Sequence, residues 1–326
     1  MESKKPTLHV FGGGELVKDC ETIALENGWD FVLRTGERFV SSLPAMLDST
    51  KVLVGNSLKN LMDEGGLPDD SDIGISLSAP WVIPSSIINL FDGRLFNLHH
   101  APLPKFRGAG GPCWRIMMND RSGGVCIHEL VPGIDAGDIL ASVHFDFPAD
   151  LQFPGEYDSF ILKHSKKLFI KWLNAALSSD ISLIKQNAKP QVGEGEYWPR
   201  LHTDTHGWID WSWSIDDIIS FCHAFSHPYS GALTMIQNNL IRIKKLSREV
   251  EPHKFHPFQT GLIFRKDSKK IWVAHPDGAL ILEDFLIEQD EVKLRLGDRL
   301  YSPAEKLEIA LKTRIQYKPD GNVFEN

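Results

Sequence analysis

Short apolar runs alternate with polar or helix-like segments along the first half of the chain. Residues 7–12 (TLHVFG) read as a buried strand, Gly12-Gly13-Gly14 ends it, and a helical stretch follows to about Asn27. Further strand-like runs occur at 31–33, 51–54, 73–77 and 94–98. Strands that alternate with helical segments predict an α/β fold, a Rossmann-like wound and mostly parallel sheet.

The same pattern continues to about residue 180. Residues 110–120 predict a helix with Pro112 in its first turn, where the missing N–H costs nothing. Residues 124–130 predict a strand, and Asp158 to Leu177 predict a long amphipathic helix. The Gly-rich 12–14 segment lacks the GxGxxG spacing and the Walker lysine, so we interpret it as a tight turn rather than a phosphate site.

The composition changes after about residue 180. Lys185 to His206 is polar and rich in Gly and Pro, and Ser214 is a suitable N-cap for a following helix. Five short strands then predict a small barrel; they span 231–236, 240–245, 261–264, 271–274 and 280–285. The prediction is a first domain at 1–185, a linker at 186–207 and a C-terminal domain at 208–326.

Charge and composition narrow the function classes. The 326 residues carry a formal net charge of −8, which argues weakly against a nucleic-acid partner. The four cysteines form no CxxC pair, so buried reduced thiols of a cytosolic protein are expected rather than a zinc site or disulfides. The polar start (MESKKPTLHVFGGG) is not typical of a signal peptide, and no apolar run approaches the ~20 residues of a membrane span. We therefore expect a cytoplasmic protein with no membrane partner.

Three residues carry the candidate chemistry. Asn97 and His99 stand on alternate positions at the end of a predicted strand, and Asp135 stands in a Gly-rich loop between apolar runs. An amide that holds an oxyanion, a titratable ring and a carboxylate beside that ring suit acyl transfer to a nitrogen nucleophile. His100 points to the opposite face of an extended strand, so we leave it outside the predicted catalytic set.

Order and spacing also give a family resemblance. The motif Asn97-Leu98-His99, the turn LPKFRG (103–108) and the run Asp135-Ala136-Gly137-Asp138 resemble the N10-formyltetrahydrofolate-dependent formyltransferases. The resemblance implies N10-formyltetrahydrofolate as co-substrate and no metal. It also implies that Asn97 donates to the oxyanion, His99 is a cationic acid and Asp135 keeps His99 charged. Asp135 or His99 acting as the base stays open.

The same resemblance suggests binding residues. Two segments are candidates for the folate pocket through their backbone groups: Trp81, Val82 and Ile83, and Val131, Pro132, Gly133, Ile134 and Asp135. Trp81 is equally well interpreted as core packing. Arg107 and Lys105 are either substrate ligands or charges of a turn that shapes the pocket.

The formyl acceptor is inferred from the second half. Tyr197-Trp198-Pro199-Arg200 resembles the aromatic-Pro-Arg turn of sugar formyltransferases, and Tyr197, Trp198 and Arg200 become candidate ligands of a nucleotide. The expected acceptor is a nucleotide-linked amino sugar of the kind used in lipopolysaccharide biosynthesis. Methionyl-tRNA formylation is the alternative, with formyltetrahydrofolate hydrolysis third. Relatives of this type carry an OB-like C-terminal domain, and a homodimer is compatible with the sequence.

Overall fold

A computed structural model describes residues 4–43, 47, 51–109, 111–288, 293–318 and 323–325. Its first half holds a seven-stranded sheet in the order β3-β2-β1-β4-β5-β7-β8. The first five are parallel, and β7 and β8 are antiparallel. The strands are β1 (Thr7–Gly12), β2 (Asp30–Thr35), β3 (Val52–Val54), β4 (Ile73–Leu77), β5 (Leu95–His99), β7 (Ser122–Glu129) and β8 (Ile139–Asp146). The predicted wound, mostly parallel sheet is confirmed.

Helices cover both faces of this sheet, which explains the near-continuous apolar runs of its central strands. Successive residues alternate between two cores, since Val10 and Phe96 lie in the larger one and Phe11 and Leu95 in the smaller one. The helices of this half are α1 (Val17–Glu26), α2 (Leu58–Gly65), α3 (Ser85–Ile88), α4 (Pro112–Met118), α5 (Pro154–Ser178) and α6 (Ile181–Lys185). Helix α5 begins four residues before the predicted Asp158 because Pro154 occupies its first turn.

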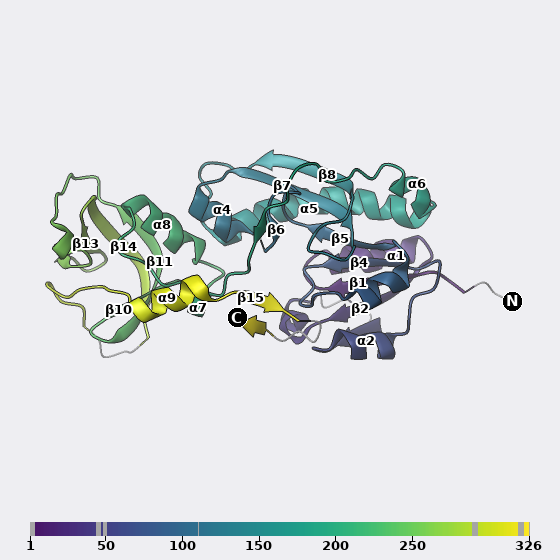
Figure 1. Cartoon of the computed structure of the whole chain (residues 1–326), viewed down its shortest axis with the longest axis horizontal. Helices are drawn as coiled ribbons and strands as arrows, with labels where there is room; N and C mark the ends of the chain where they lie inside the picture. The colour runs from purple at the N-terminus through teal and green to yellow at the C-terminus, as the bar shows by residue number, and fades with distance from the viewer. Residues whose placement is uncertain are drawn as a thin grey trace.

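A second, antiparallel sheet lies at the other end of the molecule (Figure 1). Its order is β10-β11-β14-β13-β12, and isolated bridges join Met235 beside Tyr301 and Leu262 beside Arg299. Residues 299–301 therefore connect the two edge strands, as the predicted small barrel requires. The strands are β10 (Ala232–Ile236), β11 (Asn239–Arg248), β12 (Ile263–Lys266), β13 (Ile271–His275) and β14 (Gly278–Ile287), and helix α8 (Ile215–Ala224) begins after the Ser214 N-cap.

The segment between the two sheets packs along the first half of the chain. Strand β9 (Tyr197–Trp198) pairs in parallel with β6 (Arg107–Gly108), and Lys189 bridges to Ile139. Beyond it lie α7 (Thr203–His206), α9 (Ala304–Lys312) and the hairpin of β15 (Ile315–Tyr317) and β16 (Val323–Glu325). Arg200 bridges to Ile315, so the end of the chain returns to this segment. The division into two domains and a linker stays a prediction.

Two further expectations concern single features. All four cysteines are free and buried, as expected from their spacing. Within the described ranges, every helix is too short or too polar to cross a bilayer.

Candidate active site

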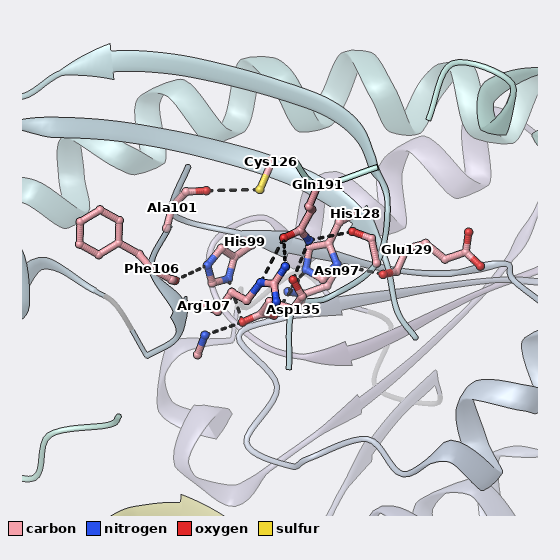
Figure 2. A network of polar contacts seen from close by, with 12 residues as sticks. Asn97, His99, Ala101, Phe106, Arg107, Cys126, His128, Glu129, Asp135 and Gln191 are labelled. Carbon is pink, nitrogen blue, oxygen red and sulfur yellow. Dashed lines mark hydrogen bonds and ion pairs between the residues drawn. The ribbon is translucent and has the colours of Figure 1, made fainter. Parts of the chain in front are cut away.

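The register between β5 and β7 brings polar side chains together in the middle of the sheet. Asn97 pairs directly with His128, and His99 pairs with Cys126. Since residues two apart on a strand share a face, Asn97, His99 and His128 all lie on one face of the sheet. Figure 2 shows these three side chains around Asp135.

Asp135 reaches the same place from the loop between β7 and β8. Its backbone has a positive φ of 46°, and Gly137 approaches Glu129 so closely that a Cβ would lie 1.9 Å from the Glu129 carbonyl oxygen. Asp135 Oδ2 lies 3.7 Å from His99 Nδ1, and Oδ1 lies 3.4 Å from His128 Nε2. The three residues singled out in the sequence therefore converge, and one carboxylate faces two imidazoles.

Hydrogen bonds orient both rings. His99 Nε2 donates to the Phe106 carbonyl at 2.9 Å, and His128 Nδ1 donates to the Glu129 carbonyl at 2.9 Å. Because a carbonyl can only accept, each of these nitrogens carries a proton. The second nitrogen of each ring faces the site: His99 Nδ1 lies toward Asp135, and His128 Nε2 lies 3.1 Å from Asn97 Nδ2. Each of these nitrogens holds a lone pair whenever its ring is neutral.

Burial and charge act in opposite directions on the pKa values of this group. Burial raises the pKa of Asp135, but positive charge on His99 when that ring is protonated, the contact with His128 and the Gly108 N–H at 2.7 Å outweigh it, so the pKa lies well below its usual range. Burial lowers the pKa of His99 more than Asp135 raises it, and His128 adds to the lowering. The net direction is opposite to the expectation that Asp135 keeps His99 charged, and it favours the neutral ring.

Two buried basic groups lie behind the site. The Arg115 guanidinium packs over the Phe106 ring, 4.5 Å from its centroid, and its nitrogens have no hydrogen-bond partner in the described part of the chain. Burial lowers the pKa of His100 to about 4, and the charges of His99 and Arg115 contribute. His100 is thereby kept neutral.

Arg107 and Gln191 hold the loop that carries Asp135. Arg107 donates to Gln191 Oε1 through Nε at 3.1 Å and Nη2 at 2.6 Å. Gln191 Nε2 donates to the carbonyls of Asp135 at 2.7 Å and Gly137 at 2.9 Å. These contacts give Arg107 a supporting position. Gln191 was missed by sequence reasoning, because its polar, Gly-rich surroundings are typical of a linker.

The first predicted folate segment packs into the smaller core, and the second begins next to a residue that packs against that core. Trp81 packs inside that core and donates its indole N–H to the Asn56 carbonyl at 2.7 Å, whereas Val82 next to it is half exposed. Leu130, which precedes the second segment, packs against the same core. The second segment itself is open to solvent, as Pro132, Gly133 and Ile134 are exposed. The folate roles of both segments stay predictions.

The predicted acceptor residues follow the β6–β9 pairing. The Trp198 ring stacks on Phe106 with centroids 6.2 Å apart, and the Tyr197 ring covers Gly108, where a Cβ would lie 2.5 Å from it. Arg314 packs over Tyr197, 5.0 Å from the ring centroid. Arg200 and Lys105 are exposed. Tyr197 therefore pairs with Arg107, the neighbour of Gly108, whose backbone N–H binds the Asp135 carboxylate. The sequence did not indicate that Tyr197 lies so near Asp135.

In the described parts of the chain, no three His, Cys, Asp or Glu side chains are arranged to hold a metal ion. Asn97, His99 and His128 instead have hydrogen-bond partners in one another and in main-chain carbonyls (Figure 2).

Comparison with solved structures places the fold. The chain superposes on WlaRD, a sugar 3N-formyl transferase solved in the presence of dTDP and 5-N-formyl-THF, with TM-score 0.59 and 19% identity over 87% of this chain and 99% of that one. It superposes equally on an N-formyltransferase from Helicobacter canadensis in complex with folinic acid and dTDP-3-aminofucose, with TM-score 0.59 and 18% identity over 86% and 100%. At these identities the similarity shows a shared fold.

Comparison of sequences places the family. Methionyl-tRNA formyltransferase of Rickettsia bellii (strain RML369-C) is 27% identical over 198 residues, which are 61% of this chain and 61% of that protein. The chain thus matches about three-fifths of that relative's length. The family model described as formyl transferase matches residues 75–158, which include Asn97, His99, His128 and Asp135. The model of the formyl transferase C-terminal domain matches residues 202–293. Together the two ranges take in more than half of the sequence, and the chain belongs to the formyl transferase family of enzymes.

Proposed function

We propose that this protein transfers a formyl group from N10-formyltetrahydrofolate to the amine of a nucleotide-linked amino sugar. The observation that carries the proposal is the convergence of Asn97, His99 and Asp135 around one point at the end of β5. An amide donor, an imidazole with a free lone pair and a carboxylate are the groups that acyl transfer to an amine requires.

Each side chain has a distinct part in the proposed reaction. Asn97 has a second N–H beside the one directed at His128, and it can donate to the formyl oxygen as negative charge develops there. His99 Nδ1 holds a lone pair when the ring is neutral, so it can take the proton that the attacking amine loses. Once His99 is protonated, its positive charge is stabilised by the Asp135 carboxylate on one side and by the negative charge that develops on the formyl oxygen on the other.

The surroundings of Asp135 fit a folate as the formyl donor. The exposed segment 132–134, which directly precedes Asp135 in the chain, and the half-exposed Val82 offer apolar contacts and main-chain groups to such a ligand. N10-formyltetrahydrofolate would supply the formyl group at this place, and its N10 would leave as tetrahydrofolate by taking the proton that His99 accepted from the amine. The two solved formyltransferases named above were crystallised with folate derivatives, which supports the assignment.

Three observations support a nucleotide sugar as the acceptor. The net charge of −8 disfavours a long nucleic-acid partner. Tyr197 and Trp198 place aromatic rings next to Gly108, whose N–H binds the Asp135 carboxylate, and Arg200 and Arg314 bring cations to the same segment. Aromatic rings can stack on a base and arginine can pair with a diphosphate. Both structural neighbours also carry dTDP or a dTDP sugar.

A binding panel tests the acceptor class directly. We expect one of dTDP, UDP, GDP and CMP to raise the melting temperature, and the matching amino sugar to be formylated with N10-formyltetrahydrofolate. tRNA in a filter-binding assay serves as the competitor. Tight binding and formylation of methionyl-tRNA without any nucleotide shift would replace the proposal with the tRNA activity. Formate release without an added amine would indicate the hydrolase.

A further inference from the structure

His128 lies next to Asn97, His99 and Asp135. Its side chain is fully buried, and it contacts both Asn97 and Asp135. The ring also meets His99 edge-on, with centroids 6.1 Å apart. A buried imidazole that touches all three members of the site is placed to control their orientation.

The hydrogen bonds of His128 determine which of its nitrogens is free. Nδ1 donates to the Glu129 carbonyl at 2.9 Å, so the single proton of the neutral ring is on Nδ1. Nε2 then accepts, and the nearest donor is Asn97 Nδ2 at 3.1 Å. Asp135 Oδ1 is farther away at 3.4 Å, and when ionised it can only accept, so it competes with Asn97 by favouring a proton on Nε2.

We propose that His128 is a positioning residue that fixes the direction of the Asn97 amide. An amide has an NH2 end and an oxygen end of nearly equal shape, and only its partners decide which end faces which way. The lone pair on His128 Nε2 holds the NH2 end toward the site. A proton on Nε2 would instead attract the oxygen end and turn the oxyanion donor away from the formyl oxygen.

This inference rests on the proposed function, because the amide matters only if it stabilises an oxyanion. The tautomer itself can be measured without turnover. Long-range 1H–15N NMR spectra of the free protein, with the His128→Gln variant used for assignment, should show a neutral His128 ring protonated at Nδ1. A ring protonated at Nε2, at a pH where the enzyme is active, would overturn the proposal even if formyl transfer is confirmed.

Kinetic variants test the consequence. His128→Leu removes the acceptor at similar size, and we expect kcat to fall about 100-fold, the typical cost of one oxyanion donor, with unchanged KM for both substrates. His128→Gln can place an amide oxygen where Nε2 was, so it should recover most of kcat. In the double variant Asn97→Ala/His128→Leu, kcat should be no lower than in Asn97→Ala alone, because both changes remove the same interaction.

A purely structural histidine would behave differently. His223 is a buried histidine of helix α8 whose Nε2 contacts the Leu246 carbonyl at 3.1 Å, so His223→Leu is a matched control. It should lower the melting temperature and leave kcat unchanged. If the effects of Asn97→Ala and His128→Leu multiply in the double variant, or if His128→Gln is as slow as His128→Leu, the positioning role is excluded. Absence of turnover in the wild type would instead refute the proposed function and leave the tautomer measurement intact.

Discussion

Asn97 and His128 face each other directly across the antiparallel pair β5–β7, with 3.1 Å between Nδ2 and Nε2. The next pair along the strands is Leu98 with Ile127, which points to the opposite face. A slip of one residue in this register would put Ile127 beside Asn97 and turn His128 into the core. The hydrophobic alternation of β7 therefore fixes the site as firmly as the polar residues do.

Alanine variants of the three converging residues test the role of each. We expect Asn97→Ala to lose about 100- to 1000-fold in kcat, the range for one oxyanion donor. His99→Ala and Asp135→Ala should each lose most of their turnover with N10-formyltetrahydrofolate. Circular dichroism should show folded protein in each case. Turnover close to that of the wild type in two of the three would refute the assigned roles.

The direction of the His99 pKa leads to a titration experiment. Burial lowers this pKa more than Asp135 raises it, so we expect the ring in the free protein to titrate below the ordinary value of about 6.5. Asp135→Asn removes the raising charge and should move the titration to still lower pH. NMR of the ring, assigned with His99→Gln, measures both. A midpoint above 6.5 in the wild type would show that Asp135 keeps His99 charged, as the sequence alone suggested.

Sequence patterns identified some residues of the site but not others. Asn97, His99 and Asp135 could be named because their order and spacing, with the turn 103–108, resemble a known family, and because parallel sheets place functional residues at strand ends. His128 could not be singled out within the predicted strand 124–130, since its importance depends on the register of β7 against β5. The charge state of His99 depends on burial, which spacing does not report.

For the fold as well, some elements could be predicted from the sequence and others could not. Thr7–Gly12 and Ile73–Leu77 were predicted to the residue, because apolar runs bounded by turns define buried strands. Strand β8 was missed: its exposed and half-buried residues lack a strong pattern. Segment 186–207 looks like a linker in composition, and yet it contributes Gln191 and Tyr197 to the surroundings of Asp135. The polar composition of a segment indicates that it is exposed to solvent, but it does not indicate which loop the segment packs against.

The contact between Gln191 and the Asp135 loop predicts a kinetic effect at a distance from the chemistry. Gln191→Ala removes both donors to the loop carbonyls and leaves the Arg107 guanidinium without this acceptor. A shift of the carboxylate by about 1 Å can cost up to about 100-fold in rate, so kcat should fall while KM for the acceptor stays similar.

The double variant Arg107→Ala/Gln191→Ala should be no slower than the worse single variant, because the two residues act in one network. Gln186→Ala, at the end of α6, is the control and should keep wild-type kcat. An unaltered kcat in Gln191→Ala would mean that the loop holds Asp135 without help from this segment.

A buried network at the start of β1 should govern acid stability. Asp72 accepts hydrogen bonds from His9 Nε2 at 3.1 Å, Thr7 N at 2.7 Å and Asp69 N at 2.9 Å. Burial alone would raise the pKa of Asp72, but these bonds outweigh it and the pKa is lowered. A carboxyl group whose pKa is lower in the folded state stabilises that state at pH values above its pKa in the unfolded chain, which is about 3.9. This stabilisation is lost as the pH falls through the pKa of the folded state.

We therefore expect Asp72→Asn to lower the free energy of unfolding at pH 7 by about 1–3 kcal/mol, the cost of weakened buried hydrogen bonds. The difference from the wild type should shrink below about pH 4. Urea unfolding at several pH values measures it, with the exposed Asp146→Asn as control. A difference that stays constant down to pH 2 would show that the charge of Asp72 contributes nothing.

Tyr197 provides the sharpest test of the acceptor side. Its ring covers Gly108 and is partly exposed, and the Gly108 N–H binds the Asp135 carboxylate. If the ring stacks on the acceptor's base, Tyr197→Ala should raise the acceptor KM about 2- to 10-fold, as expected for a lost aromatic pair. KM for N10-formyltetrahydrofolate should not change, because the predicted donor segments are 81–83 and 131–135 and the Tyr197 ring packs on Gly108 instead. Tyr301→Ala, a partly exposed tyrosine of the barrel, is the matched control. Equal KM values for the acceptor in Tyr197→Ala and the wild type would exclude stacking on this ring and leave the formyl donor site unaffected.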